Sequence, residues 1–133
     1  MENTANALSL ASNYLRLRPD SSIEVLAGGK EFWEKLMQGG YGDFKNEYLV
    51  TTSTFSEDWP SWENHVNGDE IVFLLSGNVE FFLELPEGTS SVVVDKPGDY
   101  VRVPRNTWHT AKTRVETSML FITAGEGTQV RPV

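Results

Sequence analysis

The chain has 133 residues, a length that suits one domain with its own hydrophobic core. Its 39% hydrophobic and 11% aromatic content is typical of a globular protein and excludes a largely disordered chain. A formal net charge of -8, with no local run of Lys and Arg, argues against partners such as nucleic acid or an anionic membrane surface. The absence of cysteine excludes disulfides and thiolate metal sites.

The first residues are polar and small, so we expect residues 1–12 to be loose. They lack the basic-then-apolar order of a secretory signal, and no apolar stretch approaches the ~20 residues that a membrane crossing needs, so we expect a cytoplasmic protein. Residues 13–18 alternate apolar with polar and predict a strand that ends at Pro19, and residues 22–26 predict a second short strand.

A short N-terminal helix is predicted between Gly28-Gly29 and Gly39-Gly40. Its apolar residues recur at helical spacing, and they are Phe32, Trp33, Leu36 and Met37. We expect this helix to cover part of a sheet, with Phe32 and Trp33 in the core.

From residue 46 onward the pattern is that of β structure. Strands are predicted at 48–55, 71–75, 79–85, 91–94, 100–103, 109–112 and 118–123, separated by Gly- and Pro-containing turns. Such spacing indicates an all-β, antiparallel sandwich or barrel, here one domain over 1–133. Residues 71–75 are apolar at every position, so we expect cover on both faces, by the helix or by a second subunit.

Four side chains have the chemistry of metal ligands. Glu63 and His65 are two residues apart and share one face of an extended chain, while Glu70 opens the next strand and His109 lies far along the sequence. Imidazole and carboxylate are good ligands for divalent metals. Two buried carboxylates would also repel each other, and a divalent cation would cancel their charge.

Two segments resemble the motifs of the cupin family. The segment from Glu63 through His65 and Glu70 to Gly77 resembles the first motif, with its two ligand positions one residue apart, then a glutamate, then a glycine. The segment Gly98-Asp-Tyr-Val-Arg-Val-Pro-Arg-Asn-Thr-Trp-His109 resembles the second, which supplies the last histidine. The resemblance, looser over about 46–123, implies a small β-barrel or jelly roll whose four ligand positions point inward onto one metal ion.

Three positions depart from the family pattern. Glu63 replaces the first histidine, so it is expected either as a ligand or as a proton acceptor beside the metal, a catalytic role. Asn106 replaces a glycine, and Asn tolerates the left-handed backbone that this turn requires. Thr113 replaces a late asparagine, from which nothing follows.

The residue types leave the metal open among Fe, Mn, Zn and Ni. The alternative is an empty barrel with two ordinary half-buried histidines. Candidate pocket residues are Trp59, Trp62, Tyr100, Arg102 and Trp108, because aromatic rings stack on flat substrates and Arg pairs with a carboxylate. Each also has a plainer role: the aromatics in the barrel ends, the core or a dimer interface, and Arg102 in a surface salt bridge.

The resemblance implies a metal-dependent cupin acting on a small organic molecule, as a dioxygenase-like oxidoreductase, a lyase or an isomerase. The alternatives are a module that binds or senses a small molecule, and a structural protein with a vestigial site. Fold cannot choose among them. Cupins are often dimers, and the apolar 71–75 segment agrees with a homodimer.

Overall fold

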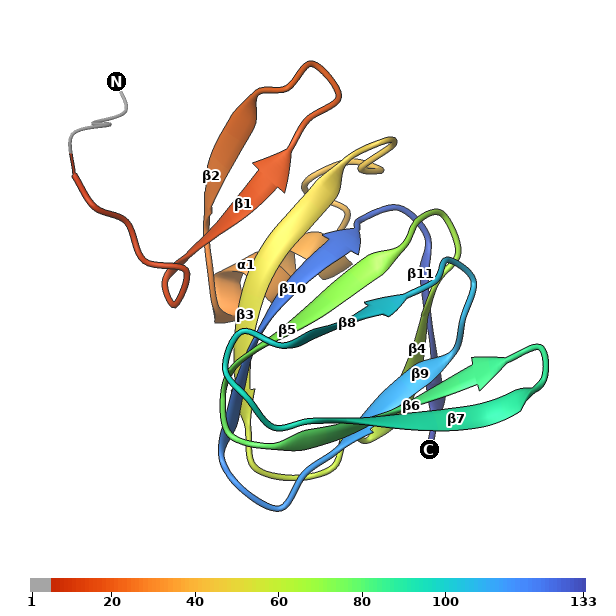
Figure 1. Ribbon diagram of the computed structural model, residues 1–133. Helices are drawn as coiled ribbons and strands as arrows, with labels where there is room; N and C mark the ends of the chain where they lie inside the picture. Colours follow the sequence, from red (N-terminus) through yellow and green to blue (C-terminus); the bar gives the residue numbers. More distant parts are fainter. Residues whose placement is uncertain (1–5) are drawn as a thin grey trace.

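The computed structural model describes residues 6–133, which fold into two facing antiparallel sheets and a short helix (Figure 1). Residues 1–5, part of the segment expected to be loose, lie outside the described residues. The elements are β1 (Asn13–Leu17), β2 (Ile23–Ala27), α1 (Lys30–Met37), β3 (Tyr48–Phe55), β4 (Ser61–His65), β5 (Glu70–Ser76), β6 (Val79–Leu85), β7 (Gly88–Val94), β8 (Tyr100–Val103), β9 (His109–Lys112), β10 (Thr117–Ala124) and β11 (Thr128–Pro132).

The two sheets enclose a shared interior, so the predicted all-β jelly-roll barrel is confirmed. The first sheet has the strand order β2-β1-β3-β10-β5-β8, and the second has the order β11-β4-β9-β6-β7. Figure 1 shows the sheets facing each other, with β1 and β2 extending the first sheet beyond the barrel. Alternate residues of the strands fill the interior. The fully buried ones include Val72, Leu74, Val79, Phe81, Ala111 and Met119.

The strand at the C-terminal end is a feature that the sequence pattern does not reveal. β11 pairs with β4 along its whole length, with Thr128 opposite His65. Its five residues, Thr-Gln-Val-Arg-Pro, contain one large apolar side chain, so the alternation that signals a half-buried strand is too weak to detect. Its role is to cover the outer edge of the strand that carries Glu63 and His65.

The helix α1 packs with one face against the extended part of the first sheet. Phe32 is fully buried, in a second cluster with Tyr14, Leu26, Phe44 and Leu49. Trp33 is 45% exposed, so the prediction that it belongs to the core is wrong. An eight-residue helix buries a narrow stripe, and Phe32 occupies it. Within residues 6–133, no helix has the length and apolar character needed to span a membrane.

β5 alternates in burial although its sequence is continuously apolar. Val72 and Leu74 are fully buried in the barrel, whereas Ile71 and Phe73 are half-buried and Leu75 is 41% exposed on the other face. The helix does not cover that outer face, because Phe32 packs with Leu49 on the interior side of the sheet. Of the two covers considered for 71–75, the helix is therefore excluded, and a second subunit stays a prediction.

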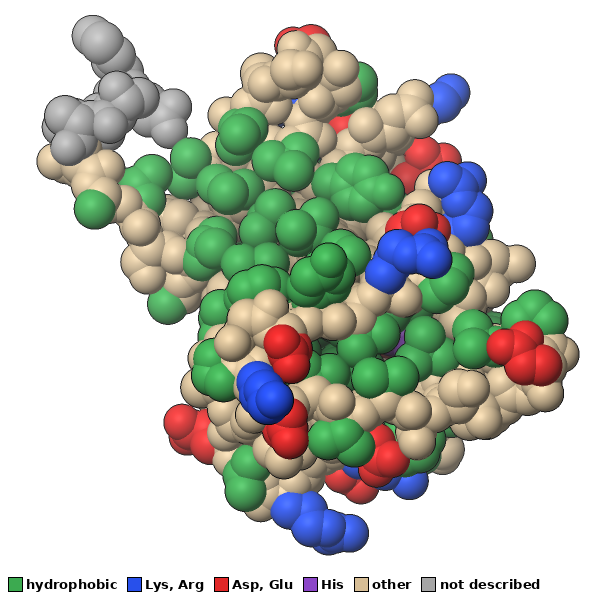
Figure 2. Space-filling view, viewed as in Figure 1, with side chains coloured by type: hydrophobic (Ala, Val, Ile, Leu, Met, Phe, Trp, Pro, Cys, Tyr) green, Lys and Arg blue, Asp and Glu red, His purple; other side chains and the backbone are tan. Residues whose placement is uncertain are grey.

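The outer face of the first sheet forms an apolar surface. Figure 2 shows apolar side chains gathered where β1, β3 and β10 lie in Figure 1. By strand register, its members are Leu15, Leu17, Ile23, Val25, Val50, Ile71, Phe73, Leu75, Tyr100, Leu120 and Ile122. We call this set the outer apolar face.

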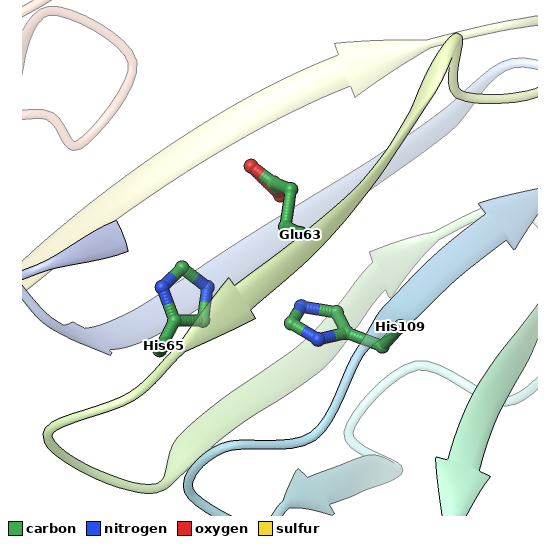
Figure 3. A group of neighbouring side chains, drawn as sticks. All are labelled: Glu63, His65 and His109. Atoms are coloured by element: carbon green, nitrogen blue, oxygen red, sulfur yellow. The ribbon is translucent and has the colours of Figure 1, made fainter. Parts of the chain in front are cut away.

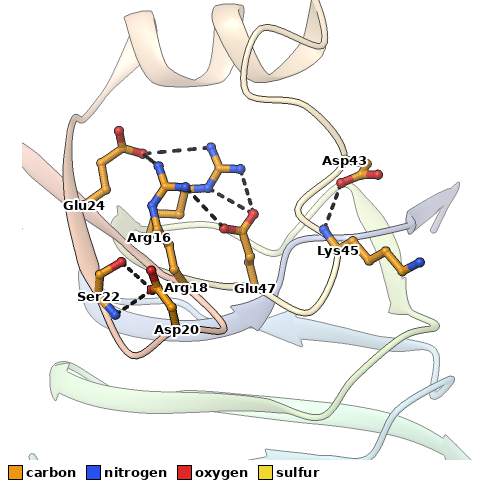
Figure 4. A network of polar contacts seen from close by, with 8 residues as sticks. All are labelled: Arg16, Arg18, Asp20, Ser22, Glu24, Asp43, Lys45 and Glu47. Carbon is orange, nitrogen blue, oxygen red and sulfur yellow. Dashed lines mark hydrogen bonds and ion pairs between the residues drawn. The ribbon is translucent and has the colours of Figure 1, made fainter.

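A polar network holds β1 and β2 to the segment before β3 (Figure 4). Arg16 donates to Glu47 through Nη2 at 2.7 Å, and its guanidinium lies 4.4 Å from the ring centre of Phe44. Arg18 pairs with Glu24 at 2.7 Å. The Arg16 and Glu47 side chains are only 12% and 9% exposed, so this pair is shielded from water and holds Phe44 in the second cluster.

Candidate metal centre

Four ligand-type side chains meet inside the barrel, from both sheets. Glu63 and His65 lie on β4, and Glu63 is directly opposite His109 on the neighbouring strand β9. Paired residues in antiparallel strands share a face, so these three project together into the interior. Figure 3 shows the His109 ring reaching toward the two side chains of β4. Glu70 begins β5 in the opposite sheet and closes the group.

The ligand atoms of the group are close enough to share one ion. One potential ligand atom from each of Glu63, His65 and His109 lies within 4.8 Å of the others. The Glu70 carboxylate lies 3.2 Å from Nε2 of His65 through Oε2 and 3.0 Å from Nε2 of His109 through Oε1. The sequence-predicted set of four is thus brought together at one place.

The tautomer of His109 leaves its Nε2 atom free for a metal. Its Nδ1 lies 3.0 Å from the carbonyl oxygen of Thr107, and because a carbonyl only accepts, Nδ1 carries the proton. The neutral ring then presents a lone pair at Nε2, toward Glu70. Nδ1 of His65 is held by the Thr128 hydroxyl at 2.9 Å, which likewise turns its Nε2 inward.

Unsatisfied polar atoms mark the same place. Of the buried side-chain nitrogen and oxygen atoms in residues 6–133, four lack a hydrogen-bond partner, and three belong to this group. They are Nε2 of His65, Nε2 of His109 and Oε1 of Glu70. Buried polar groups without partners are costly, and a divalent cation would satisfy all three together. The residues present therefore fit a metal ion.

The site perturbs the pKa values of its own groups. Burial raises the pKa of the Glu70 carboxyl, but contacts with His109 and His65 outweigh burial and lower it to about 2. Burial likewise lowers the pKa of His109, yet the neighbouring Glu70 carboxylate outweighs it and the net direction is upward. Burial, together with the charge of Glu70, raises the pKa of Glu63. These are the responses of carboxylates and imidazoles packed into one water-poor space.

A pocket of about 350 Å³ opens above the group. It is lined by Trp33, Leu36, Leu49, Thr51, Ser53, Trp59, Pro60, Ser61, Glu63, His65, Glu70, Phe121, Thr123, Gly125 and Thr128. The volume suits a small organic molecule. Trp33, which the sequence assigns to the core, is one of its lining residues.

Of the five predicted pocket residues, one lines the pocket and four lie elsewhere. Trp59 lines the pocket, and its ring centre lies 6.4 Å from that of His109. Trp62 and Trp108 alternate with the ligand residues and so face away, where their rings flank the guanidinium of Arg131 at 5.2 and 4.5 Å.

Tyr100 and Arg102 also lie apart from the pocket, on the outer side of β8. Tyr100 is 62% exposed and stacks on Phe73, with ring centres 6.5 Å apart. Arg102 pairs with Asp69 at 3.3 Å, which is the plainer surface role expected for it. The outward residues of β8 are opposite Ile71 and Phe73 of β5, so they share the outer face of that sheet.

Two threonines support the ligands, and sequence reasoning does not find them. Thr123 of β10 donates to Oε2 of Glu70 at 2.6 Å, and Thr128 of β11 holds His65. Partners of this kind fix the orientation of metal ligands. Thr128 belongs to the strand that the sequence pattern does not reveal. The position of Thr123, on the strand beside Glu70, becomes informative only once β10 is paired with β5.

Comparison with known proteins gives one sequence relative and several structural ones. No family model matches the chain. An acireductone dioxygenase from Bacillus licheniformis is 43% identical over 47 residues, which cover 35% of this chain and 26% of that protein. The chain thus matches only about a quarter of the length of that relative.

Solved structures share the architecture. The hydroquinone 1,2-dioxygenase of Sphingomonas sp. TTNP3, solved with 4-hydroxybenzoate bound, superimposes with a TM-score of 0.52 at 17% identity, covering 60% of each chain. The arrangement of this chain agrees with that likeness, because its two sheets face each other and Glu63 and His109 point inward from the adjacent strands β4 and β9. This chain has the cupin fold.

Two further solved structures resemble this chain at low sequence identity. Peruvianin-I, named as a cysteine peptidase of Thevetia peruviana latex, gives a TM-score of 0.54 at 12% identity, over 65% of this chain and 56% of that chain. A cupin superfamily protein of Desulfitobacterium hafniense gives 0.48 at 20% identity, over 58% and 66%. One fold hosts many functions, so activity must be argued from the site.

Proposed function

We propose that this cupin is a metal-dependent enzyme of dioxygenase or lyase type that acts on a small organic molecule in the pocket. The observation that carries the proposal is the convergence of two buried imidazole Nε2 atoms on the Glu70 carboxylate, beside the floor of the pocket that His65 and Glu70 line. Such atoms are costly unless a cation binds them. The partial likeness to a dioxygenase supports the direction of the chemistry.

The donor set supports one divalent ion held by His65, Glu70 and His109. Two imidazoles and one carboxylate, with further positions open, suit Fe(II), and a second carboxylate also suits Mn, Zn and Ni. When bound, such an ion would supply Lewis-acid or redox chemistry to a substrate oxygen. The threonines behind His65 and Glu70 would hold these ligands in place.

Glu63 has a second role in the proposal. Its raised pKa means that it holds a proton at higher pH than an ordinary glutamate. A carboxyl of this kind, lining the pocket beside the ligands, is suited to accept or return a proton at the substrate. It serves either as the fourth ligand or as this base.

Metal analysis tests the proposal. We expect the purified protein to carry close to one equivalent of a divalent ion, and the Fe(II) form to consume O2 or convert members of a panel of phenolic and carbonyl compounds. His65→Ala and His109→Ala should each lose the metal, because each removes one of three buried ligands. Trp62→Phe, on the same strand but facing away, should keep it. Elemental analysis showing no metal, with no uptake on titration, would contradict the proposal.

A binding or sensing module is the alternative, and isomerisation is a third outcome of the same site. A metabolite recovered unchanged from the pocket of the metal-loaded protein would favour binding, whereas turnover of any panel compound favours catalysis. If the variants Glu63→Ala, His65→Ala and His109→Ala all keep the metal content and activity of the unaltered protein, the site is vestigial.

We also propose that the protein is a homodimer. The outer apolar face is left uncovered by the helix and includes Leu75 at 41% and Ile23 at 59% exposure. Large apolar patches on a protein surface are typical of interaction sites. The cytoplasmic location stays a prediction, which cell fractionation would check.

A further inference from the structure

The pocket above the candidate metal centre has two chemically different parts. Its floor holds Glu63, His65 and Glu70, of which the last two are at most 5% exposed. Its walls are mainly apolar, with hydroxyls from Thr51, Ser53 and Ser61, and their large apolar side chains come from four different parts of the chain. These include Leu36 of α1, Leu49 of β3, Trp59 before β4, and Phe121 of β10. A molecule that fills this pocket would therefore meet polar groups at one end and an apolar surface along its body.

The helix α1 contributes to this wall from outside the barrel. Trp33 and Leu36 line the pocket, although α1 belongs to the N-terminal extension rather than to the segment that resembles a cupin. Trp33 is 45% exposed, whereas the floor is buried, so Trp33 lies at the rim. The rim is thus built by residues that lie outside the segment that carries the candidate metal ligands.

The Trp33 ring is held in a defined position. Its centre lies 4.9 Å from that of Phe32 and 6.2 Å from that of Tyr14, both in edge-on arrangements. Phe32 is fully buried in the second cluster and anchors the helix. Aromatic rings packed in this way lose little freedom when a ligand binds, so Trp33 offers a preformed apolar surface.

The pocket lacks positive charge. Among the described residues, neither Lys nor Arg lines it, while Glu63 and Glu70 do. Arg16, a cation beside the second cluster, is already bound to Glu47 and lies over Phe44. A second anionic group on a ligand would therefore be desolvated with no partner.

We propose that α1 is a specificity element, in which Trp33 and Leu36 select a small, flat, apolar body that carries a single oxygen-donor head. The head would reach the metal, so this part rests on the proposed function; the apolar selection by α1 does not. Molecules with a phosphate or a second carboxylate on the body are rejected.

Hydroxamate probes test the proposal, because they share one metal-binding head and differ in the body. In Mn(II)-loaded protein, we expect benzohydroxamate to bind at least about tenfold more tightly than acetohydroxamate, and 4-carboxybenzohydroxamate to lose most of that gain. Trp33→Ala and Leu36→Ala should each reduce the benzohydroxamate advantage severalfold and leave acetohydroxamate unchanged. Met37→Ala, on the same helix but 88% exposed and outside the pocket lining, is the matched control.

A second measurement needs no metal. Binding of 4-fluorophenol to the metal-free protein, followed by fluorine NMR, should weaken severalfold in Trp33→Ala and stay unchanged in Met37→Ala. Failure of both hydroxamates to bind, with intact 4-fluorophenol binding, would overturn the metal centre and spare the role of α1. Equal affinity of the two hydroxamates, or 4-fluorophenol binding that Trp33→Ala and Leu36→Ala leave unchanged, would overturn the role of α1 itself.

Discussion

Three side chains of the candidate centre are each oriented by a hydrogen-bond partner outside the centre. His109 is oriented by a backbone carbonyl, His65 by a hydroxyl, and Glu70 by a hydroxyl from the next strand. Each ligand thus has a partner on its far side and an open atom on its near side. Such arrangements raise metal affinity because the ligands are already oriented in the folded protein, so metal binding costs less conformational entropy.

Protons and metal should compete at these groups. The pKa values of His109 and Glu63 are raised, so both hold a proton at higher pH than in an unfolded chain. Above its raised pKa, His109 is neutral and Nε2 can bind a metal; below it, a proton occupies the ring. Affinity for Mn(II) should therefore fall as pH falls, by up to about tenfold per pH unit for each proton displaced.

Calorimetric titration with Mn(II) at pH about 6 and about 8, on either side of an ordinary histidine pKa, checks this expectation. His65→Ala should bind weakly at both values. An affinity that is the same at the two pH values would show that no proton leaves these groups when the metal binds.

Turns between strands decide whether the motif residues reach the interior. Gly77 joins β5 to β6 with φ of +97°, and Gly98 precedes β8 with φ of +97°. A Cβ atom on Gly77 would lie 2.5 Å from the carbonyl oxygen of Glu116 and 2.7 Å from Cα of Thr117, whereas one on Gly98 would meet nothing within 4 Å. A non-glycine residue would be strained by the positive φ in either turn, but only at Gly77 would its Cβ atom also lack room.

Alanine at the two glycines should therefore have unequal effects. Gly98→Ala introduces backbone strain alone, about 1–2 kcal/mol. Gly77→Ala adds a clash with backbone atoms, which costs about 1–3 kcal/mol more. Chemical denaturation measures both free energies of unfolding, and the Gly98 variant is the control for strain. Equal losses of stability would mean that the turn at Gly77 moves aside without cost.

The molecule as a single body has an apolar barrel interior, a pocket with a polar floor, and an uncovered apolar face on its first sheet. The helix closes the inner side of the extended sheet and does not cover the outer apolar face, whose most exposed members are Ile23, Leu75 and Tyr100. A second copy of the chain is the partner we propose for it, because each copy would cover the face of the other.

Light scattering tests this dimer. The protein at tens of micromolar should have the mass of two chains, and Phe73→Glu, in the middle of the outer apolar face, should reduce it to one. Val115→Glu, at a loop residue that is 50% exposed and outside that face, should leave the dimer intact. A single-chain mass for the unaltered protein would refute the dimer.

Local sequence is sufficient for most of the strands and for the turns, and it is sufficient to nominate the four candidate ligands. Alternation of apolar residues reveals most strands because their period of two is a local property. Asn106 has φ of +57°, and its expected left-handed backbone is confirmed because Asn tolerates that conformation. Ligand chemistry, two histidines and the motif spacing are sufficient to group Glu63, His65, Glu70 and His109.

Long-range packing supplies the rest, since it joins residues with no local relation. That Trp33 lines the pocket, and that Trp62 and Trp108 turn away from it, depends on which face of each element meets its neighbour. Thr123 and Thr128 support ligands 53 and 63 residues away in sequence. Such contacts follow from sheet order and register, which are properties of the closed barrel and have no signature in any one segment.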